Sequence, residues 1–311
     1  MPNLNYAEQW STELLDIIMQ ETLISPFMTT NVRWVGARTF HFTQMSTSGY
    51  KPHNRSGGWN QGTFTQTDVP FTLTHDRDIE FLVDKADVDE TNATASIENI
   101  SKTFTKTQAT PEMNALFFSK CAQAAVKLTG YHSETTLAEF TVANVYSKLK
   151  SMLSAGKLRR YKAKGALIMY VRSELMDLLE RSTELQRKVE MTQIAEGGIG
   201  LETRVTYIDG VPIFEVIDDE VFYSKFDFSD GFKPATDGKH INVLIASPMT
   251  TKFVPKINSI YFFAPGNHTK GDGYLYQNHA LSDVFTFPNG KDNKVDSLYV
   301  DIEKAAAASA A

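Results

Sequence analysis

The stretch from residue 31 to residue 83 constrains the fold most, because its pattern predicts one very long β-hairpin with little to bury. Phe40 and Phe42 alternate with polar residues on the way out, and Phe71 does so on the way back. Residues 46–62 between the strands, STSGYKPHNRSGGWNQG, are turn-forming and cannot build a core. A two-stranded ribbon of this length is marginal by itself. The pattern therefore predicts a partner surface, and a neighbouring subunit is the simplest one.

Large side chains at the hairpin tip are candidates for contacts between subunits. Tyr50 and Trp59 stand among turn residues, where no core is expected to cover them. Aromatic residues are enriched in protein interfaces, and the chain has 20 Phe, 12 Tyr and 3 Trp. The complete set of predicted contact residues is Trp10, Trp34, Tyr50, Lys51, Arg55 and Trp59.

Residues 1–30 predict an N-terminal arm. They contain four acidic residues and no Lys or Arg, and Trp10, Leu14 and Ile17 fit an apolar helical stripe. Ser25-Pro26 is expected to end that helix or to follow its end closely. The arm is expected to pack on the core of its own chain or on a neighbour.

Residues 110–130, TPEMNALFFSKCAQAAVKLTG, predict a long helix. Thr110 suits the N-cap, Pro111 the first helical position, and Gly130 a left-handed C-terminal cap. Apolar residues recur at helical spacing from Met113 onward, which predicts one apolar face packed on a sheet. The opposite face is expected near the inner surface of an assembly or near a neighbour.

The second half of the chain predicts a mixture of helices and strands, and thus an α+β fold. Thr136-Leu-Ala-Glu139 matches a capping box, which should open a helix that Gly156 closes. Residues 166–171, ALIMYV, predict a buried strand, after which Ser173 should cap another helix. Asp209-Gly210 predicts a tight turn between two strands.

Composition argues for a folded protein without disulfides. Hydrophobic residues make up 42% and charged residues 22%. Cys121 is the single cysteine, and its apolar neighbours predict a buried packing residue. The start of the chain lacks a signal-peptide pattern, and the sequence has no apolar run of the ~20 residues that span a bilayer. A net charge of −6 argues against a dedicated nucleic-acid binder.

The motifs that carry enzymatic chemistry are missing from the sequence. Its 7 histidines are scattered, without a metal-ligand spacing. Residues 196–200, EGGIG, lack the Lys-Ser/Thr of a phosphate loop, and there is no Gly-x-Ser-x-Gly elbow. Asp218, Asp219 and Glu220 are adjacent carboxylates, which more often face solvent than share a proton. We therefore predict no catalytic residue, no cofactor and no metal site.

Seven basic residues without an intervening acid form the sharpest charge feature. They are Lys148, Lys150, Lys157, Arg159, Arg160, Lys162 and Lys164. A solvated helix end explains part of the pattern through the helix dipole. A contact with a nucleic-acid backbone and an ion-pair face against a neighbouring subunit are the alternatives. Lys157, Arg159, Arg160, Lys162 and Lys164 are the candidates for either contact.

The order of these elements resembles the tailed-bacteriophage major capsid proteins of the Hong Kong-97 fold. The arm, the long hairpin and TPEMNALFFSKCAQAA look like that family's opening half. ALIMYV, RSELMDLLERS and TYIDGVPIFEV look like its axial domain, and NSIYFFAPGNHTKGDGYLYQ looks like the return to its peripheral domain. The implied division is an arm (1–30), an extended-loop hairpin (31–83), a peripheral domain with a spine helix (84–133), an axial domain (134–255), return strands (256–304) and a disordered tail (305–311).

The resemblance implies a virion coat protein that is assembled in the cytoplasm of a bacterial host. Copies would form pentamers and hexamers of an icosahedral head that encloses double-stranded DNA through weak, non-specific contacts. A separate scaffolding protein and a portal are implied partners, and no membrane is involved. An encapsulin-like nanocompartment shell is the alternative of related fold. A cytosolic enzyme with an unrecognised site is the alternative of another class.

Overall fold

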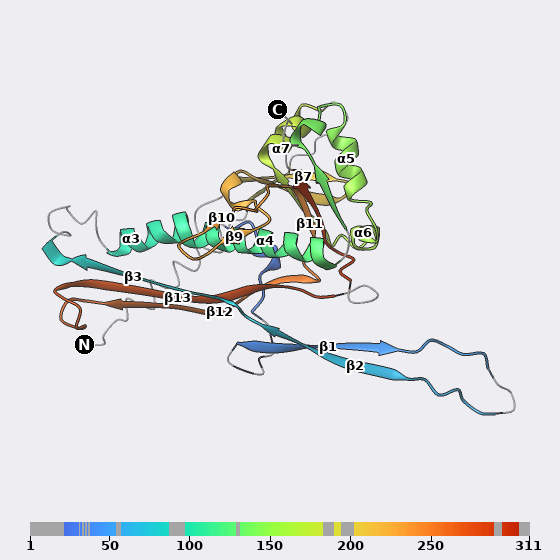
Figure 1. The fold of residues 1–311 in the computed structure, drawn as a ribbon, viewed down its shortest axis with the longest axis horizontal. Helices are drawn as coiled ribbons and strands as arrows, with labels where there is room; N and C mark the ends of the chain where they lie inside the picture. Colours follow the sequence, from blue (N-terminus) through green and yellow to red (C-terminus); the bar gives the residue numbers. More distant parts are fainter. Residues whose placement is uncertain are drawn as a thin grey trace.

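The computed structural model describes residues 22–30, 32, 34, 36, 38–53, 57–86, 97–128, 131–182, 190–193, 202–288 and 294–304. Their elements form three parts (Figure 1). A long helix runs along a three-stranded sheet, short helices surround a seven-stranded sheet, and a two-stranded hairpin points away from both. Helices and strands do not alternate regularly along the chain, and the expected α+β class is confirmed.

The three-stranded sheet has the spatial order β12-β13-β3, and both of its pairs are antiparallel. The strands are β3 (His75–Asp84), β12 (Thr251–Phe263) and β13 (Gly273–Thr286). The expected hairpin of residues 31–83 is therefore wrong in its last part, because β3 pairs with β13. Alternation of apolar and polar residues predicts a strand but does not identify its partner.

The hairpin itself consists of β1 (Thr39–Thr47) and β2 (Phe64–Thr72), which pair antiparallel. At its base, Phe40 and Phe71 pack against Phe285 of β13, with ring centroids 4.8 and 5.2 Å away. This aromatic cluster anchors the hairpin to the sheet. Beyond the cluster the hairpin projects far from the body of the molecule (Figure 1).

The long helix begins before the expected start. α3 (Ile97–Phe104), a π-helical turn η2 (Thr105–Ala109) and α4 (Thr110–Leu128) follow one another without a break. The N–H of Thr110 donates to the carbonyl of Thr105, five residues earlier, so the expected N-cap at Thr110 is wrong. Pro111 has no N–H, and its ring would clash with the preceding turn of a regular α-helix, so a widened turn accommodates it. The expected cap at Gly130 lies outside the described residues.

Most of the remaining strands form the seven-stranded sheet. In spatial order they are β4 (His132–Thr135), β14 (Tyr299–Glu303), β11 (Ile241–Ala246), β5 (Ile168–Arg172), β8 (Val211–Val216), β7 (Glu202–Ile208) and β6 (Glu190–Gln193). The pairs β4–β14 and β5–β8 are parallel. The expected buried strand is β5, in which every residue is buried. β14 lies here and not in the three-stranded sheet, which corrects the expected grouping of residues 256–304 as return strands.

The tight turn between β7 and β8 is confirmed. Asp209 and Gly210 have φ values of 50° and 79°, as a two-residue turn with both central residues left-handed requires. The turn sets Ile208 opposite Val211, and both side chains are buried.

Short helices surround the seven-stranded sheet. They are η3 (Leu137–Glu139), α5 (Val145–Met152), α6 (Leu158–Lys162) and α7 (Ser173–Glu180). The capping box is present at Thr136 and Glu139, but it opens only three helical residues, so the expected long helix is wrong. Asn144 accepts a hydrogen bond from the Thr141 N–H at 2.8 Å, which competes with helix continuation.

The cap expected at Ser173 is also wrong. The helix α7 is preceded by Arg172 at the N-cap position, without a side-chain cap. The hydroxyl of Ser173 instead donates to Glu215 of β8 at 2.8 Å. It therefore ties α7 to the neighbouring strand.

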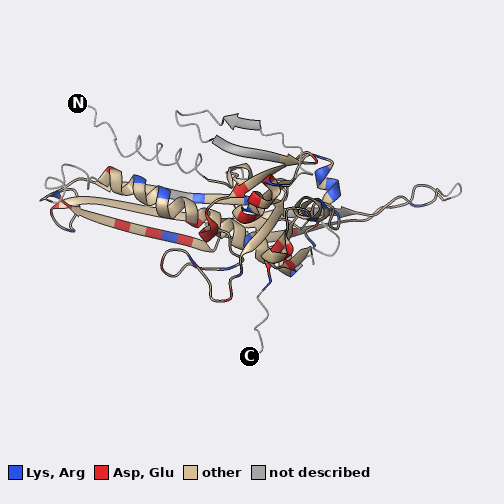
Figure 2. Cartoon of the chain, turned by 90° about the horizontal axis from the view of Figure 1, so that it is seen from above, with Lys and Arg blue, Asp and Glu red and all other residues tan. Residues whose placement is uncertain are grey.

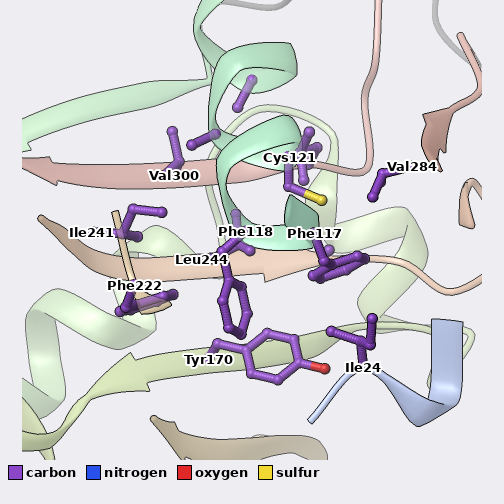
Figure 3. Packing of buried hydrophobic residues seen from close by; sticks show 14 of the residues in the cluster. Ile24, Phe117, Phe118, Cys121, Tyr170, Phe222, Ile241, Leu244, Val284 and Val300 are labelled. Atoms are coloured by element: carbon purple, nitrogen blue, oxygen red, sulfur yellow. The ribbon is translucent and has the colours of Figure 1, made fainter. Parts of the chain in front are cut away.

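The main core lies around α4, between the two sheets. Phe118 of α4 packs on Tyr170 of β5 with ring centroids 5.1 Å apart (Figure 3). Val284 of β13, in the three-stranded sheet, belongs to the same buried cluster. The helix is buried at every position from Asn114 to Ser119. The expectation of a single apolar face is therefore wrong, because two sheets cover α4 from different sides.

The last residues of the expected arm pack on their own chain. Phe27, in the short helix η1 (Ser25–Phe27), lies 4.7 Å from Phe117 between ring centroids. The hydroxyl of Tyr170 donates to the carbonyl of Leu23 at 2.7 Å. Of the two surfaces expected for the arm, residues 22–28 thus use the core of their own chain. Residues 1–21 and the tail 305–311 lie outside the described residues.

Candidate assembly interface

The hairpin tip is ordered by its own polar groups. Just beyond the paired strands, the Ser48 N–H donates to the Thr63 carbonyl at 2.8 Å, and the Thr63 N–H donates to the Ser48 hydroxyl at 3.0 Å. Lys51 donates from Nζ to the carbonyl of Gln61 at 3.0 Å, and Asn60 donates to the carbonyl of Pro52 at 2.7 Å. Turns of this kind hold a loop in shape without a hydrophobic core. The tip can therefore present side chains outward.

Large apolar side chains are exposed along this projection. Trp59 exposes 96% of its surface, and Tyr50 is fully exposed. Met45 and Phe64 expose 66% and 70% further down the shaft, on the same face of the ribbon. Single exposed apolar residues are ordinary, but a group on one projection indicates a contact surface. Met45 and Phe64 were missed from the sequence, because placing both on one face requires the pairing register of the two strands.

The other predicted contact residues are either partly buried in their own chain, not tested for contact, or outside the described residues. Trp34 is half-buried in its own chain, where its ring lies 5.6 Å from Phe40 and Lys256 lies 4.1 Å above it. Its contact with a neighbour remains a prediction, as does that of Lys51. Trp10 and Arg55 lie outside the described residues.

The face of the three-stranded sheet that points away from the long helix also exposes apolar side chains. Phe81 and Tyr276 face the helix, with Phe81 lying 5.5 Å from Phe104 of α3 between ring centroids. Leu82 and Tyr261 occupy the opposite face and expose 50% and 54% of their surfaces. The sequence analysis did not single out either residue.

Within the described residues, some cations of the basic stretch form ion pairs with acids of their own chain, and others do not. Lys157 lies 2.9 Å from Asp296 and Lys162 lies 2.7 Å from Asp209. Lys150 and Lys148 also have acidic partners within their own chain, Asp209 at 3.5 Å and Glu139 at 3.7 Å. The remaining cations of the stretch, Arg159, Arg160 and Lys164, are exposed and form no ion pair among the described residues.

Cys121 is a packing residue, as expected. It is fully buried in α4 (Figure 3), and burial raises the pKa of its thiol far above the ordinary value. A thiol in this position is a poor nucleophile. The described part of the chain also holds no group of three His, Cys, Asp or Glu residues that could bind a metal ion. Within the same residues, no helix is long and apolar enough to cross a membrane.

The adjacent carboxylates 218–220 lie at the edge of a charged cluster. Arg172 pairs with Glu174 at 2.7 Å and with Glu303 at 3.0 Å. Burial, reinforced by Glu174, raises the pKa of Asp219. Burial also lowers the pKa of His240, whose ring stacks on Tyr223 at 3.9 Å between centroids. Arg172 thus ties the end of β5 to the end of β14, whereas Asp218, Asp219 and Glu220 form no ion pair among the described residues.

Comparisons with known proteins identify the fold. No family model matches the sequence, and no curated protein matches it either. The capsid protein in the asymmetric unit of the bacteriophage PhiM1 mature capsid is similar in structure, with a TM-score of 0.64 and 14% sequence identity. The match covers 92% of this chain and 88% of that chain. The fold is that of phage capsid proteins.

Other solved structures share this fold. The capsid of the Cyanophage P-SCSP1u matches with a TM-score of 0.61 and 10% identity, covering 92% of this chain and 89% of that chain. A virus-like particle from Pyrococcus furiosus matches with a TM-score of 0.50 and 11% identity, over 97% of this chain and all of that chain. The two phage capsids have the higher TM-scores of these three structures.

Proposed function

We propose that this chain is the major capsid protein of a tailed bacteriophage. Its copies form pentamers and hexamers of an icosahedral head that encloses double-stranded DNA. The observation that carries the proposal is the hairpin β1–β2, which projects from a phage-capsid fold with Trp59 and Tyr50 exposed at its tip. A paired ribbon with exposed aromatics gains stability from a second surface, and a lattice of identical subunits supplies one.

The hairpin is proposed to lie over an adjacent subunit in the shell. Met45 and Phe64 add an apolar side to its shaft, and Leu82 and Tyr261 add exposed apolar area to a sheet face of the body. Burying such side chains is favourable by about 25 cal/mol per Å² of apolar surface.

The proposed partners are copies of the same chain, a separate scaffolding protein, a portal and packaged DNA. The structural comparisons support the first of these through the shared fold. The net charge of −6 suits a container that holds DNA without condensing tightly onto it. Assembly would take place in the cytoplasm of the bacterial host, and the product would be a component of the virion.

The test is the state of the purified protein. We expect electron microscopy and light scattering to show closed particles of uniform diameter when the chain is produced alone or with its scaffolding protein. Particles recovered from an infection should contain double-stranded DNA. Monomers under all assembly conditions would contradict the proposal, and DNA-free particles filled with a cargo protein would replace it with a nanocompartment shell.

A further inference from the structure

The free cations of helix α6 are not needed by the fold of the single chain. Leu158 anchors this short helix in the core, whereas Arg159 and Arg160 point outward at its surface. Lys162, in the same helix, is held by Asp209. Arg159, Arg160 and Lys164 have no such partner in the described part of the chain. Neighbouring like charges repel one another, so this group favours an external partner of negative charge.

Exposed acids gather on a different side of the same part of the molecule. Asp218 and Glu220 at η4 (Asp219–Val221) have exposed side chains and form no ion pair among the described residues, and Asp177 on α7 is also exposed, with Arg181 2.6 Å away. α7 follows β5 directly, and η4 follows the neighbouring strand β8, which places the two elements side by side. We name Asp177, Asp218 and Glu220 the acidic flank.

The basic group and the acidic flank do not face one another within one chain. Figure 1 shows α6 on the side of the seven-stranded part that lies toward the hairpin, whereas α7 lies toward the opposite side. Figure 2 shows α6 as a blue segment on the hairpin side. One molecule therefore presents opposite charges on two different sides.

We propose that Arg159 and Arg160 of α6, with Lys164 just after the helix, bind the acidic flank of the next copy of this chain around a ring. This inference rests on the proposed function, which supplies rings of identical subunits. In a ring, each subunit contacts its neighbour through two different surfaces, and each surface is used once. Opposite charges on the two surfaces set the direction and the register of that contact.

A neighbouring copy fits the basic group better than a nucleic acid does. The group holds three unpaired cations in a chain of net charge −6, whereas a nucleic-acid binder carries a strongly basic domain. The guanidinium of arginine matches a carboxylate with two parallel hydrogen bonds. The acidic flank offers carboxylates for both arginines.

The experiment reverses each side of the contact and then both. The first variant is Arg159→Glu with Arg160→Glu, the second is Asp218→Lys with Glu220→Lys, and the third combines all four changes. The matched control, Lys85→Glu with Lys127→Glu, changes the net charge as the first variant does, at exposed positions outside the basic group and the acidic flank. Circular dichroism verifies folding, and sedimentation measures the assembled fraction.

We expect the first two variants to raise the protein concentration needed for assembly at least about tenfold, because each places like charges against one another. The combined variant should recover assembly to within about threefold of the unchanged chain, and the control should assemble as the unchanged chain does. Higher salt should weaken the assembly of the unchanged chain, because salt screens exposed charges.

Three outcomes would overturn the inference. The first variant could assemble as well as the unchanged chain, or the combined variant could fail to recover. The first variant could also lose affinity for double-stranded DNA while it assembles normally, which would make DNA the partner. Each of these leaves the capsid function intact if the unchanged chain forms shells. An unchanged chain that stays monomeric contradicts both this inference and the proposed capsid function. If the first variant does not fold, the neutral variant Arg159→Gln with Arg160→Gln takes its place, with the same expected direction.

Discussion

Phe118 shows how one side chain of the long helix packs on the seven-stranded sheet. It lies on α4, fully buried, with its ring 5.1 Å from Tyr170 and 4.9 Å from Phe222. Replacing it with alanine would leave a cavity that the surrounding strands cannot close. We expect Phe118→Ala to lower the free energy of unfolding by about 3–5 kcal/mol. Denaturant titration measures this loss.

The matched control for that substitution lies on the same helix. Val126 exposes 45% of its surface, so Val126→Ala should change the free energy of unfolding by about 0.5 kcal/mol or less. Equal losses for the two variants would contradict a core centred on α4.

Cys121 gives a direct test of the same core. Burial raises the pKa of its thiol, so the reactive thiolate is scarce, and the surrounding chain blocks access. We expect a thiol reagent to label the native protein very slowly and to label one thiol per chain after denaturation. Because Cys121 is the single cysteine, the measurement has one possible site. Rapid labelling of the folded chain would contradict the packing of α4.

His240 predicts a pH dependence of stability. Burial, with a smaller effect of Arg172, lowers its pKa in the folded chain below the ordinary value of 6.5, although Glu303, Asp219 and Glu174 act in the opposite direction. Below pH 6.5 the unfolded chain therefore binds a proton that the folded chain does not. The free energy of unfolding should fall as pH drops through 6.5.

The variant His240→Gln cannot bind this proton. We expect its thermal midpoint to depend less on pH between about 7.5 and 5.5 than that of the unchanged chain. This window lies above the ordinary range of carboxylates, whose titration affects both proteins alike. The same pH slope in both proteins would rule out His240 as its source.

The burial or backbone conformation of a single residue was predicted well where its neighbours in sequence determine it. The buried state of Cys121 follows from its apolar neighbours, and the turn at Asp209-Gly210 follows from the backbone angles that it requires. The two-sided burial of α4 was not predicted, because the expected stripe covers one face of the helix. Ala115, Phe118 and Ala122, at helical spacing outside that stripe, are buried as well.

At the scale of elements, the hairpin carries the most direct prediction. Deleting Ser48 to Gly58 removes the tip but leaves the paired strands and the aromatic cluster at the base. We expect this variant to remain a folded monomer and to form no shells. Circular dichroism and particle microscopy measure the two properties separately. Intact shells would show that the tip does not hold subunits together.

A second variant keeps the length of the hairpin. Tyr50→Ser with Trp59→Ser removes two exposed aromatic rings and should change the free energy of unfolding by about 0.5 kcal/mol or less. Its assembly should still be weakened, because aromatic anchors supply much of the binding energy of an interface.

Helices, strands and turns were predicted correctly where a short run of neighbouring residues specifies them. The strand β5 and the β7–β8 turn follow from short apolar runs and from turn chemistry. The pairing of β3 with β13 joins residues about two hundred positions apart, and no local pattern specifies it. A short helix from Ile97 to Phe104 was predicted and is α3, but its continuity with α4 was missed because Thr110-Pro111 resembles a helix start, whereas a π-helical turn carries the helix through the proline.

For the whole molecule, the order of elements predicted the architecture better than any motif did. The resemblance rested on the order of elements and not on a chemical signature, and no family model matches the sequence. The fold became evident from the hairpin, the long helix and the seven-stranded sheet taken together, and solved phage capsids share that arrangement at 10–14% identity. Recognising that Met45 and Phe64 lie on one face of the hairpin required the pairing register of β1 and β2.

We propose that copies of this chain build a closed icosahedral shell in which the hairpin joins neighbours. The most direct test is a cryo-electron-microscopy reconstruction of the assembled particles. We predict fivefold and sixfold clusters of subunits, with β1–β2 of each copy lying over an adjacent copy and Trp59 buried in that contact. Particles without such clusters, or a hairpin that contacts no neighbour, would contradict the account.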